Sequence, residues 1–177
     1  ASRTQMTPAA IVVMGVSGSG KSTIGHLLAE RLGWVFEDGD AFHPPANVAK
    51  MSAGTPLTDD DRWPWLRAIA ARIAQARGAG APVIIGCSAL KHAYRDVLRE
   101  GHADIRFLHL TGTPELIMAR QAARVGHFMP ASLIASQFAT LEPPDTEADV
   151  IDLDVDPEPP AIVARAIAAL RRRGDLA

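Results

Sequence analysis

Short apolar runs alternate along the chain with segments of helical periodicity. The first run, residues 10–14 (Ala-Ile-Val-Val-Met), is rich in β-branched residues and precedes a glycine, which is typical of a strand buried on both faces. Four later runs have the same character. The predicted strands are residues 10–14, 34–36, 82–85, 105–110 and 150–155.

Between these runs, apolar residues recur at helical spacing. Ile24, Leu28 and Leu32 fall on one helical face, and Gly33 ends that segment. The predicted helices are residues 22–32, 66–77, 89–99, 114–124, 131–141 and 160–173. Strands that alternate with helices indicate an α/β fold with a parallel sheet and right-handed crossovers. Residues 38–64, rich in Asp, Pro, Gly and His, are expected to mix loops with short helices.

Composition supports one ordinary globular domain over residues 1–177, with a loose polar start over residues 1–8. Hydrophobic residues make up 47% and charged residues 21%, which excludes a disordered chain, a collagen-like repeat and a coiled coil. The net charge of −2 provides no overall basic field, so neither nucleic acid nor a membrane is expected as a partner. An anionic ligand must therefore meet a local cluster of positive groups.

Cysteine usage and hydropathy indicate the cellular compartment in which the protein is expected. The single cysteine, Cys87, has no partner for an internal disulfide, which is compatible with a reducing environment. The apolar run near the start is six residues long, shorter than the roughly 7–15 residues of a secretory signal or the roughly 20 of a membrane helix. We therefore expect a soluble cytoplasmic protein.

The strongest motif follows the first predicted strand. Residues 15–22 (GVSGSGKS) satisfy the phosphate-loop pattern G-x-x-x-x-G-K-[ST]. Its glycines allow consecutive N–H groups to face one concavity at the positive end of a helix, where a phosphate chain binds. Lys21 is expected to contact the β- and γ-phosphates of ATP, and the Ser22 hydroxyl to ligate Mg²⁺. The alternative is an ordinary Gly/Ser turn before a helix. The predicted ATP-binding residues of this segment are Gly15, Val16, Ser17, Gly18, Ser19, Gly20, Lys21, Ser22 and Thr23.

The remaining motifs indicate which class of phosphate-loop protein this is. The chain has no N-K-x-D element of GTPases, and its length is that of a kinase acting on a small acceptor. A series of further motifs stands in the order seen in gluconokinases: DGD (38–40), FHPPAN (42–47), KM (50–51), GTPLTDDDR (54–62), PWL (64–66), CSALK (87–91), YR (94–95), GHFM (126–129), SQF (136–138) and LE (141–142). The chain thus resembles the gluconokinase family from about residue 11 to residue 170.

This resemblance implies a fold and a reaction. The expected fold is the three-layer phosphate-loop kinase fold of shikimate and nucleoside-monophosphate kinases, with a five-stranded parallel sheet, a mobile lid and an acceptor-binding region. The expected reaction is the ATP-dependent phosphorylation of D-gluconate at its terminal hydroxyl, with Mg²⁺. A homodimer is also expected on this ground. The rival functions are a kinase of another small hydroxy acid, such as shikimate, and a nucleotide-binding switch that hydrolyses ATP slowly.

Two carboxylates follow the second strand, at the sheet edge where α/β folds bind ligands. Asp38 is expected on the metal side and Asp40 at the acceptor hydroxyl, as in the similar shikimate kinases. Within the acceptor-binding region, about residues 38–66, the resemblance points to His43, Lys50 and Arg62 as substrate ligands. Surface salt bridges with Asp59, Asp60 and Asp61 are the alternative for these cations. For Asp59 and Asp60 we expect a capping role at a helix that begins near Pro64.

The segment after the third strand faces the same crevice. Ser88 and Lys91 are further candidate substrate ligands, although Ser88 is equally suited to cap a helix from Ala89. Cys87 is expected to be a buried apolar residue. The strand itself lacks the usual metal-binding aspartate of phosphate-loop ATPases, which leaves Mg²⁺ to Ser22, water and Asp38.

A basic set marks the expected lid, about residues 120–140. Arg120, Arg124 and His127 lie at i, i+4 and i+7, and Gly126 is a suitable hinge. We expect both arginines to be catalytic, Arg120 with ATP and Arg124 and His127 with substrate, although spacing alone does not divide these roles. A solvated basic face is the alternative. The nucleotide base is expected near residues 156–157.

Overall fold

Five parallel strands form one sheet, as predicted. The computed structural model describes residues 7–122 and 131–177. The strands are β1 (Ala10–Met14), β2 (Val35–Asp38), β3 (Val83–Gly86), β4 (Ile105–Thr111) and β5 (Val150–Asp154). Their order across the sheet is β2-β3-β1-β4-β5, and every neighbouring pair is parallel. All residues of β1 and β3 are buried, which explains their continuous apolar sequence.

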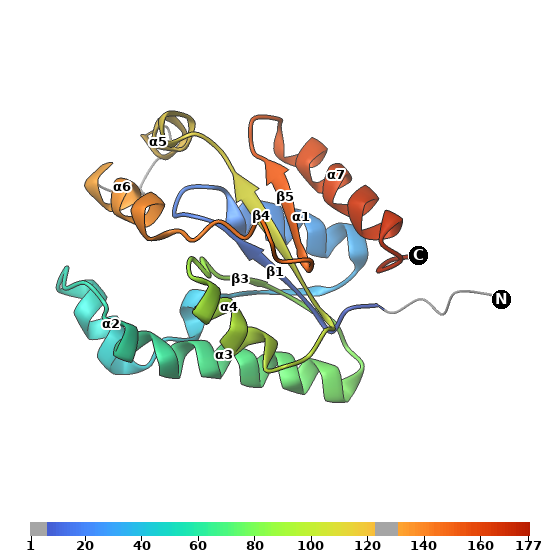
Figure 1. The fold of residues 1–177 in the computed structure, drawn as a ribbon, viewed down its shortest axis with the longest axis horizontal. Coiled ribbons are helices and arrows are strands. Elements are labelled where there is room, and N and C mark those ends of the chain that lie inside the picture. Colours follow the sequence, from blue (N-terminus) through green and yellow to red (C-terminus); the bar gives the residue numbers. More distant parts are fainter. Residues whose placement is uncertain (1–6, 123–130) are drawn as a thin grey trace.

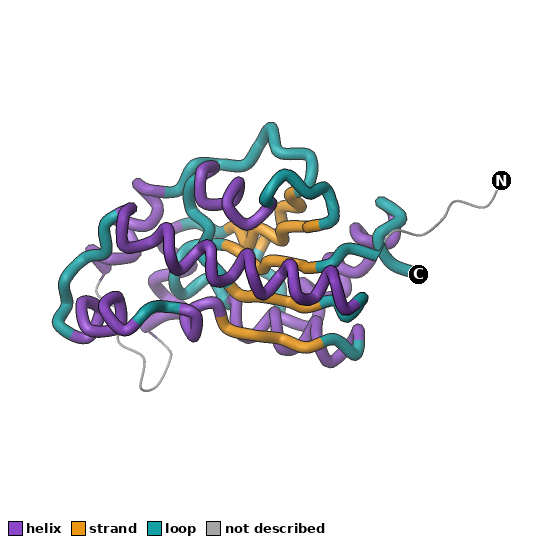
Figure 2. The backbone as a smooth tube through the Cα atoms, turned by 90° about the horizontal axis from the view of Figure 1, so that it is seen from below, coloured by secondary structure: helices purple, strands orange, loops and turns teal. Residues whose placement is uncertain are grey.

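Helices cover both faces of the sheet and make it the middle of three layers (Figure 1). On one face lie α1 (Lys21–Leu32) and α7 (Pro159–Arg172), whose apolar residues form one buried core with alternate strand residues. On the other lie α3 (Asp59–Ala79) and α4 (His92–Arg99), which form a second core. Figure 2 shows α3 running along the strands on this second face.

The connections fix where a ligand can bind. The chain leaves β1 toward β2 and β3 on one side and later continues to β4 and β5 on the other, so β1 lies at the point where the strand order reverses. At the carboxyl ends of the strands stand η1 (Gly39–Phe42), α2 (Pro45–Ser52), α5 (Pro114–Ala122) and α6 (Ala131–Thr140). Figure 1 shows α2, α5 and α6 at the end of the molecule opposite both termini.

A third, smaller core lies under α5 and α6. Val16 of the phosphate loop, Leu90, Ile117 and Ile134 form this core, with Phe138 packed against it. The two helices therefore pack on the phosphate loop itself. Among the helices of the described residues, none has the length and apolar character needed to cross a membrane.

Two helix starts differ from the predictions. α3 begins at Asp59 and runs through Pro64, because Thr58 and Asp61 form a capping box that starts the helix a full turn before the proline. The predicted cap by Asp59 and Asp60 is therefore wrong. α4 begins at His92, with Lys91 as its N-cap residue, so Ser88 does not cap it.

Candidate active site

The phosphate loop follows β1 and curls back over its own backbone. Gly15, Gly18 and Gly20 all have positive φ, and Gly20 leads directly into the first turn of α1. The Lys21 ammonium donates to the carbonyl oxygens of Gly15 and Val16, each at 3.1 Å. The loop, the helix amino terminus and Lys21 are therefore arranged as the motif predicts, with the positive end of α1 at the mouth of the loop.

Two buried polar atoms beside this loop lack hydrogen-bond partners among the described residues. They are the Ser19 hydroxyl oxygen and the Gln121 amide oxygen. A Cβ atom at Gly18 would lie 2.9 Å from that same Gln121 oxygen, so α5 packs directly on the loop. Buried polar atoms without partners are rare in folded proteins, and here they lie where a ligand is expected.

Two hydrogen bonds and one close backbone contact hold the turn that carries Asp38 and Asp40. The Asp40 backbone N–H donates to Asp38 Oδ1 at 2.9 Å, which uses one of the two Asp38 carboxylate oxygens. The Trp65 indole donates to the Gly39 carbonyl oxygen at 2.8 Å. A Cβ atom at Gly39 would lie only 2.4 Å from the Gly86 carbonyl oxygen, so only glycine fits between η1 and β3.

The Asp40 carboxylate lies at the open mouth of the site, with its side chain 82% exposed. Loss of part of its water shell and the neighbouring Asp38 carboxylate raise the pKa of Asp40, while His43 and Lys21 act in the opposite direction. Asp40 thus interacts electrostatically with both Asp38 and Lys21. The structure brings the predicted acceptor-side base and the phosphate-loop lysine to the same end of the sheet.

The side chain of His43 lies next to Asp40 and is almost fully buried, with 3% of it exposed. Its Nε2 is 3.9 Å from Asp40 Oδ1, and its ring stacks on Trp65 with centroids 4.3 Å apart. Burial and Arg62 lower the pKa of His43, and Asp40 offsets part of this effect.

A cationic cluster, formed by side chains of α3 and of the start of α4, lies at Asp59. Arg62 lies 3.2 Å from Asp59 Oδ1, Lys91 lies 3.3 Å from Asp59 Oδ2, and the Tyr94 hydroxyl donates to the same carboxylate. The hydrogen bond from Tyr94 is the largest cause that lowers the pKa of Asp59. The predicted substrate ligands Arg62 and Lys91 are thus neighbours. The ion pair between Arg62 and Asp59 is the salt bridge that the sequence left open as the alternative for Arg62. Tyr94 is a member of the cluster to which the sequence analysis gave no role.

Lys50 and Ser88 have partners in the protein. Lys50 forms an ion pair of 2.7 Å with Asp61, which is the surface salt bridge that the sequence left open as the alternative. The Ser88 carbonyl oxygen accepts from the Gly15 N–H at 3.3 Å, so the segment after β3 borders the phosphate loop. Cys87 is buried, and burial raises the pKa of its thiol to about 12, which confirms the expected inert apolar residue.

Comparison with known proteins decides the family. The family model described as an AAA domain matches residues 11–144. A gluconokinase of Gluconobacter oxydans is 47% identical over 162 residues, which cover 92% of this chain and 91% of that protein. The crystal structure of a gluconokinase from Sinorhizobium meliloti has a TM-score of 0.87 at 48% identity, over 98% of this chain and 96% of that one. The chain belongs to the gluconokinase family.

The fold is also that of more distant phosphate-loop kinases, as expected. A shikimate kinase from Bacteroides thetaiotaomicron has a TM-score of 0.67 at 16% identity, over 92% of this chain and 98% of that one. At this identity the likeness concerns the fold alone. Membership of the gluconokinase family makes the chain a phosphate-loop kinase that uses ATP.

Gln137 is a contact of the phosphate loop to which the sequence gave no role. Its amide oxygen accepts from the Ser17 backbone N–H at 2.5 Å, and its amide nitrogen donates to the Ser17 hydroxyl at 2.8 Å. The residue lies within the SQF motif, but its partner is 120 positions away in the sequence, so no local pattern reveals the contact. In this gluconokinase-family chain, Gln137 ties α6 to the first half of the phosphate loop.

Replacing Gln137 by alanine is expected to raise the KM for ATP about fivefold, because losing a net hydrogen bond costs about 1 kcal/mol and loosens the loop that holds the phosphates. Steady-state kinetics with varied ATP measures this change. Ser136→Ala, an exposed neighbour on the same helix, is the matched control. An unchanged KM for ATP in Gln137→Ala would contradict the assignment.

The basic residues of the expected lid are only partly described. The Arg120 guanidinium donates to the carbonyl oxygens of Val155 and Asp156, the second at 3.0 Å, so it supports the loop after β5. This is the loop near which the nucleotide base is expected. Arg124 and His127 lie outside the described residues.

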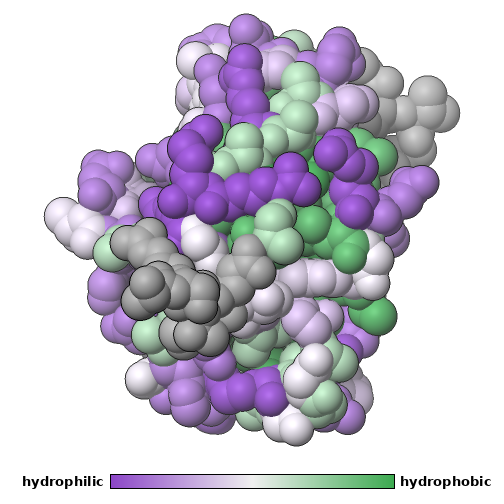
Figure 3. Space-filling model, turned by 90° about the vertical axis from the view of Figure 1, so that its right-hand side faces the viewer, coloured by the Kyte–Doolittle hydropathy of each residue, from purple (hydrophilic) through white to green (hydrophobic). Residues whose placement is uncertain are grey.

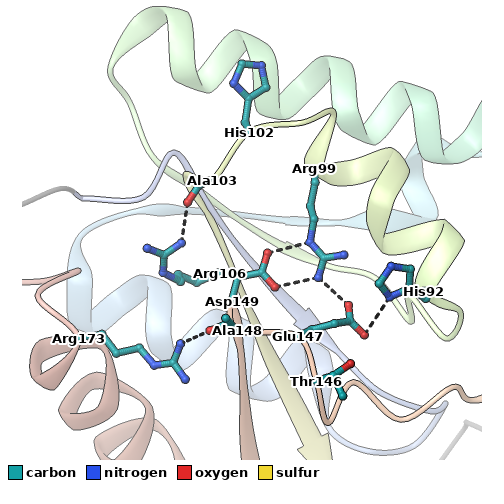
Figure 4. A pocket seen from close by; sticks show the side chains of 10 residues that line it. All are labelled: His92, Arg99, His102, Ala103, Arg106, Thr146, Glu147, Ala148, Asp149 and Arg173. Atoms are coloured by element: carbon teal, nitrogen blue, oxygen red, sulfur yellow. Dashed lines mark hydrogen bonds and ion pairs between the residues drawn. The ribbon is translucent and has the colours of Figure 1, made fainter.

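A hollow of about 690 Å³ lies at the amino ends of β4 and β5, away from the phosphate loop. Figure 3 looks onto this end of the molecule, where hydrophilic residues border a hydrophobic area. Ion pairs occupy the hollow in Figure 4: Arg99 lies 2.7 Å from Asp149 and 2.6 Å from Glu147. Glu147 also pairs at 2.7 Å with Arg95, whose side chain is fully buried. These ion pairs indicate that the residues lining this hollow stabilise the fold.

Glu147→Gln is expected to lower the free energy of unfolding by about 3 kcal/mol at pH 7, because it leaves the buried Arg95 without its counter-ion. Burial would raise the pKa of Glu147, but Arg95 and Arg99 lower it to about 2. A depressed folded pKa means that the stabilisation is complete above the ordinary value of 4.5 and is lost as pH falls toward 2. Urea unfolding at pH 7 and pH 3 should therefore show a difference from wild type that narrows at the lower pH.

The control is Glu30→Gln, on the exposed surface of α1, which should leave the free energy of unfolding within about 0.5 kcal/mol of wild type. Equal effects of the two substitutions at pH 7 would show that the Glu147 ion pairs contribute nothing to the free energy of unfolding.

Proposed function

We propose that the chain transfers the γ-phosphoryl group of ATP to the terminal hydroxyl of D-gluconate, giving 6-phospho-D-gluconate and ADP. The observation that carries this proposal is that Asp40, just after β2, lies near enough to Lys21 of the phosphate loop for the lysine charge to lower the pKa of its carboxyl group, in a gluconokinase-family chain. A carboxylate for the acceptor hydroxyl and a lysine for the transferred phosphoryl group are what in-line transfer requires.

On the nucleotide side, the loop N–H groups and the amino terminus of α1 hold the phosphates. Lys21 exchanges its contacts with the Gly15 and Val16 carbonyls for the β- and γ-phosphates and stabilises the charge that develops during transfer. Ser19 and Thr23 belong to the same phosphate-binding segment. Arg120 supports the loop at residues 156–157, on which we place the base.

On the acceptor side, Asp40 orients the terminal hydroxyl and takes its proton. We place the substrate carboxylate at Arg62 and Lys91, because an arginine fork and an ammonium there already hold the Asp59 carboxylate. Binding then requires the substrate to share these cations with Asp59 or to displace it. We also propose that His43, Lys50 and Ser88 contact the polyol.

The residues present suit a Mg²⁺ ion. Within residues 7–122 and 131–177, no group of three or more His, Cys, Asp or Glu side chains gathers as a metal site. This agrees with Mg²⁺, which is usually held by one or two protein oxygens together with phosphates and water. Ser22 and the Asp38 carboxylate provide such oxygens. When bound, Mg²⁺ neutralises charge on the β- and γ-phosphates.

We extend the proposal to larger units of the chain. Residues 38–66 form the acceptor-binding region, and residues 120–140 form the lid of a single kinase domain. Arg120 and Arg124 are proposed as the two catalytic arginines, with Arg124 and His127 contacting the substrate. A homodimer is proposed from the family resemblance.

The test is ADP release from MgATP with a panel of acceptors: D-gluconate, shikimate, adenosine 5′-phosphosulfate, AMP and none. We expect rapid release with D-gluconate alone. Release with shikimate alone would identify a different hydroxy-acid kinase. Slow release that ignores every acceptor would overturn the proposal in favour of a nucleotide-dependent switch.

A further inference from the structure

The neighbours of His43 fix the plane of its imidazole ring and the hydrogen-bonding role of each ring nitrogen. Stacking on Trp65, with an interplanar angle of 13°, holds the plane of the imidazole ring. Nε2 lies 3.9 Å from Asp40 Oδ1, and Nδ1 lies 3.1 Å from the amide nitrogen of Asn47. The hydrogen-bonding role of each ring nitrogen is thus set by a different neighbour.

The orientation of the Asn47 amide follows from a second contact. Asn47 is buried, and its amide nitrogen lies 2.8 Å from the backbone carbonyl oxygen of Asp61. A carbonyl oxygen only accepts hydrogen bonds, so the Asn47 atom that faces it must be the NH₂ group. The other orientation would place two oxygens against each other. Asp61 itself is fixed, because its carboxylate accepts from Lys50 and from the Thr58 N–H.

The same NH₂ group faces His43, so Nδ1 of the imidazole must accept its hydrogen bond. A neutral histidine that accepts at Nδ1 carries its proton on Nε2. That N–H faces the side of the ring on which Asp40 lies. Two neighbouring groups then have opposite roles: Nε2 of His43 donates, and the carboxylate of Asp40 accepts. A hydroxyl group, which both donates and accepts, is the ligand that fits between them.

We propose that Asn47 is a positioning residue that fixes His43 as an Nε2–H donor to a substrate hydroxyl held beside Asp40. This inference rests on the proposed function, since it concerns how the same site holds a polyol. It assigns His43 the task of presenting a hydrogen to the hydroxyl oxygen while Asp40 receives the hydroxyl hydrogen. His43 therefore binds and orients the acceptor and is not its base.

The first test is ¹⁵N NMR of the imidazole groups of the full-length protein at pH 7.5, with the His43 signals assigned by their loss in His43→Gln. We expect protonated Nε2 and unprotonated Nδ1 in the wild type, and a mixture of tautomers in Asn47→Ala. A wild-type His43 that carries its proton on Nδ1 would overturn the inference, whatever the enzyme's activity.

The second test is a double-mutant cycle on turnover with D-gluconate. We expect Asn47→Ala to raise the KM for D-gluconate about fivefold with little change in the KM for ATP. Val35→Ala, an exposed residue at the start of β2 and outside the acceptor-binding region, should change neither. His43→Gln, which keeps an N–H near the Nε2 position, should retain more activity than His43→Ala. In the His43→Gln background, Asn47→Ala should have little further effect.

A purely structural role of Asn47 would give the same loss in both backgrounds, and that result would overturn the inference. Failure of the proposed function looks different, because the wild type would then lack turnover that depends on D-gluconate while the NMR result would still decide the tautomer.

Discussion

Lys21→Ala is expected to lower kcat by about 10²–10³-fold, the usual loss when one preorganised donor to a developing negative charge is removed. The ammonium contacts the Gly15 and Val16 carbonyls within the loop. Under the proposed function, contacts to phosphate replace these when ATP binds. Those phosphates gain charge on the transferring oxygens during the reaction, so the loss should appear in kcat. Rapid-quench or coupled ADP assays at saturating substrates measure it.

The fold should survive this substitution, because the Lys21 side chain does not belong to the apolar cores that the two faces of the sheet bury. Thermal unfolding and the far-UV circular dichroism spectrum should stay close to those of the wild type. Arg31→Ala, in the last turn of the same helix, is the matched control and should keep full activity. Near-normal turnover by Lys21→Ala would refute the assigned role.

Asp40→Asn is expected to lower kcat by at least tenfold, within the 10²–10⁴-fold range usual for a positioned base. Asparagine has the same shape and still accepts a hydrogen bond from a hydroxyl, but it does not take the proton. The backbone of the turn should be unchanged, since the bond from the Asp40 N–H to Asp38 and the bond from Trp65 to Gly39 do not involve the substituted atoms. Pre-steady-state phosphoryl transfer isolates the affected step.

Asp60→Asn, which removes an exposed carboxylate from the first turn of α3, controls for the loss of one negative charge and should leave kcat unchanged. An unchanged kcat in Asp40→Asn would exclude Asp40 as the base and leave it only a binding role. A loss of the same size in Asp60→Asn would indicate a general electrostatic effect.

The order of the elements was readable from the sequence because local signals mark each of them. Continuous apolar runs such as residues 10–14 mark strands buried on both faces, and the phosphate loop marks the start of α1. Helix starts were less readable. Pro64 suggested a boundary, but Thr58 and Asp61 satisfy the first turn of α3 upstream of it, so the helix tolerates the proline in its second turn.

The candidate site was readable only where its residues carry a local motif. Asp38 ends β2 and Asp40 follows it, while Lys21 follows the phosphate loop after β1, so the topology alone brings them to one edge of the sheet. The hydrogen bonds from Tyr94 to Asp59 and from Gln137 to Ser17 join residues 35 and 120 positions apart, and no periodicity encodes them. The role of Asn47 was equally hidden, because it depends on which atom of a side-chain amide faces a distant carbonyl.

The position of Trp65 gives the protein an intrinsic optical reporter. Its indole lies between the turn that carries Asp40 and the ring of His43, and Trp63 stands edge-on to Tyr94 in the cationic cluster. Two of the three tryptophans therefore lie in the proposed acceptor-binding region, and Trp34 packs against the opposite face of the sheet. In a Trp34→Phe background, the fluorescence would come from the acceptor side alone, so substrate affinity becomes measurable without turnover, even in variants that no longer transfer phosphate.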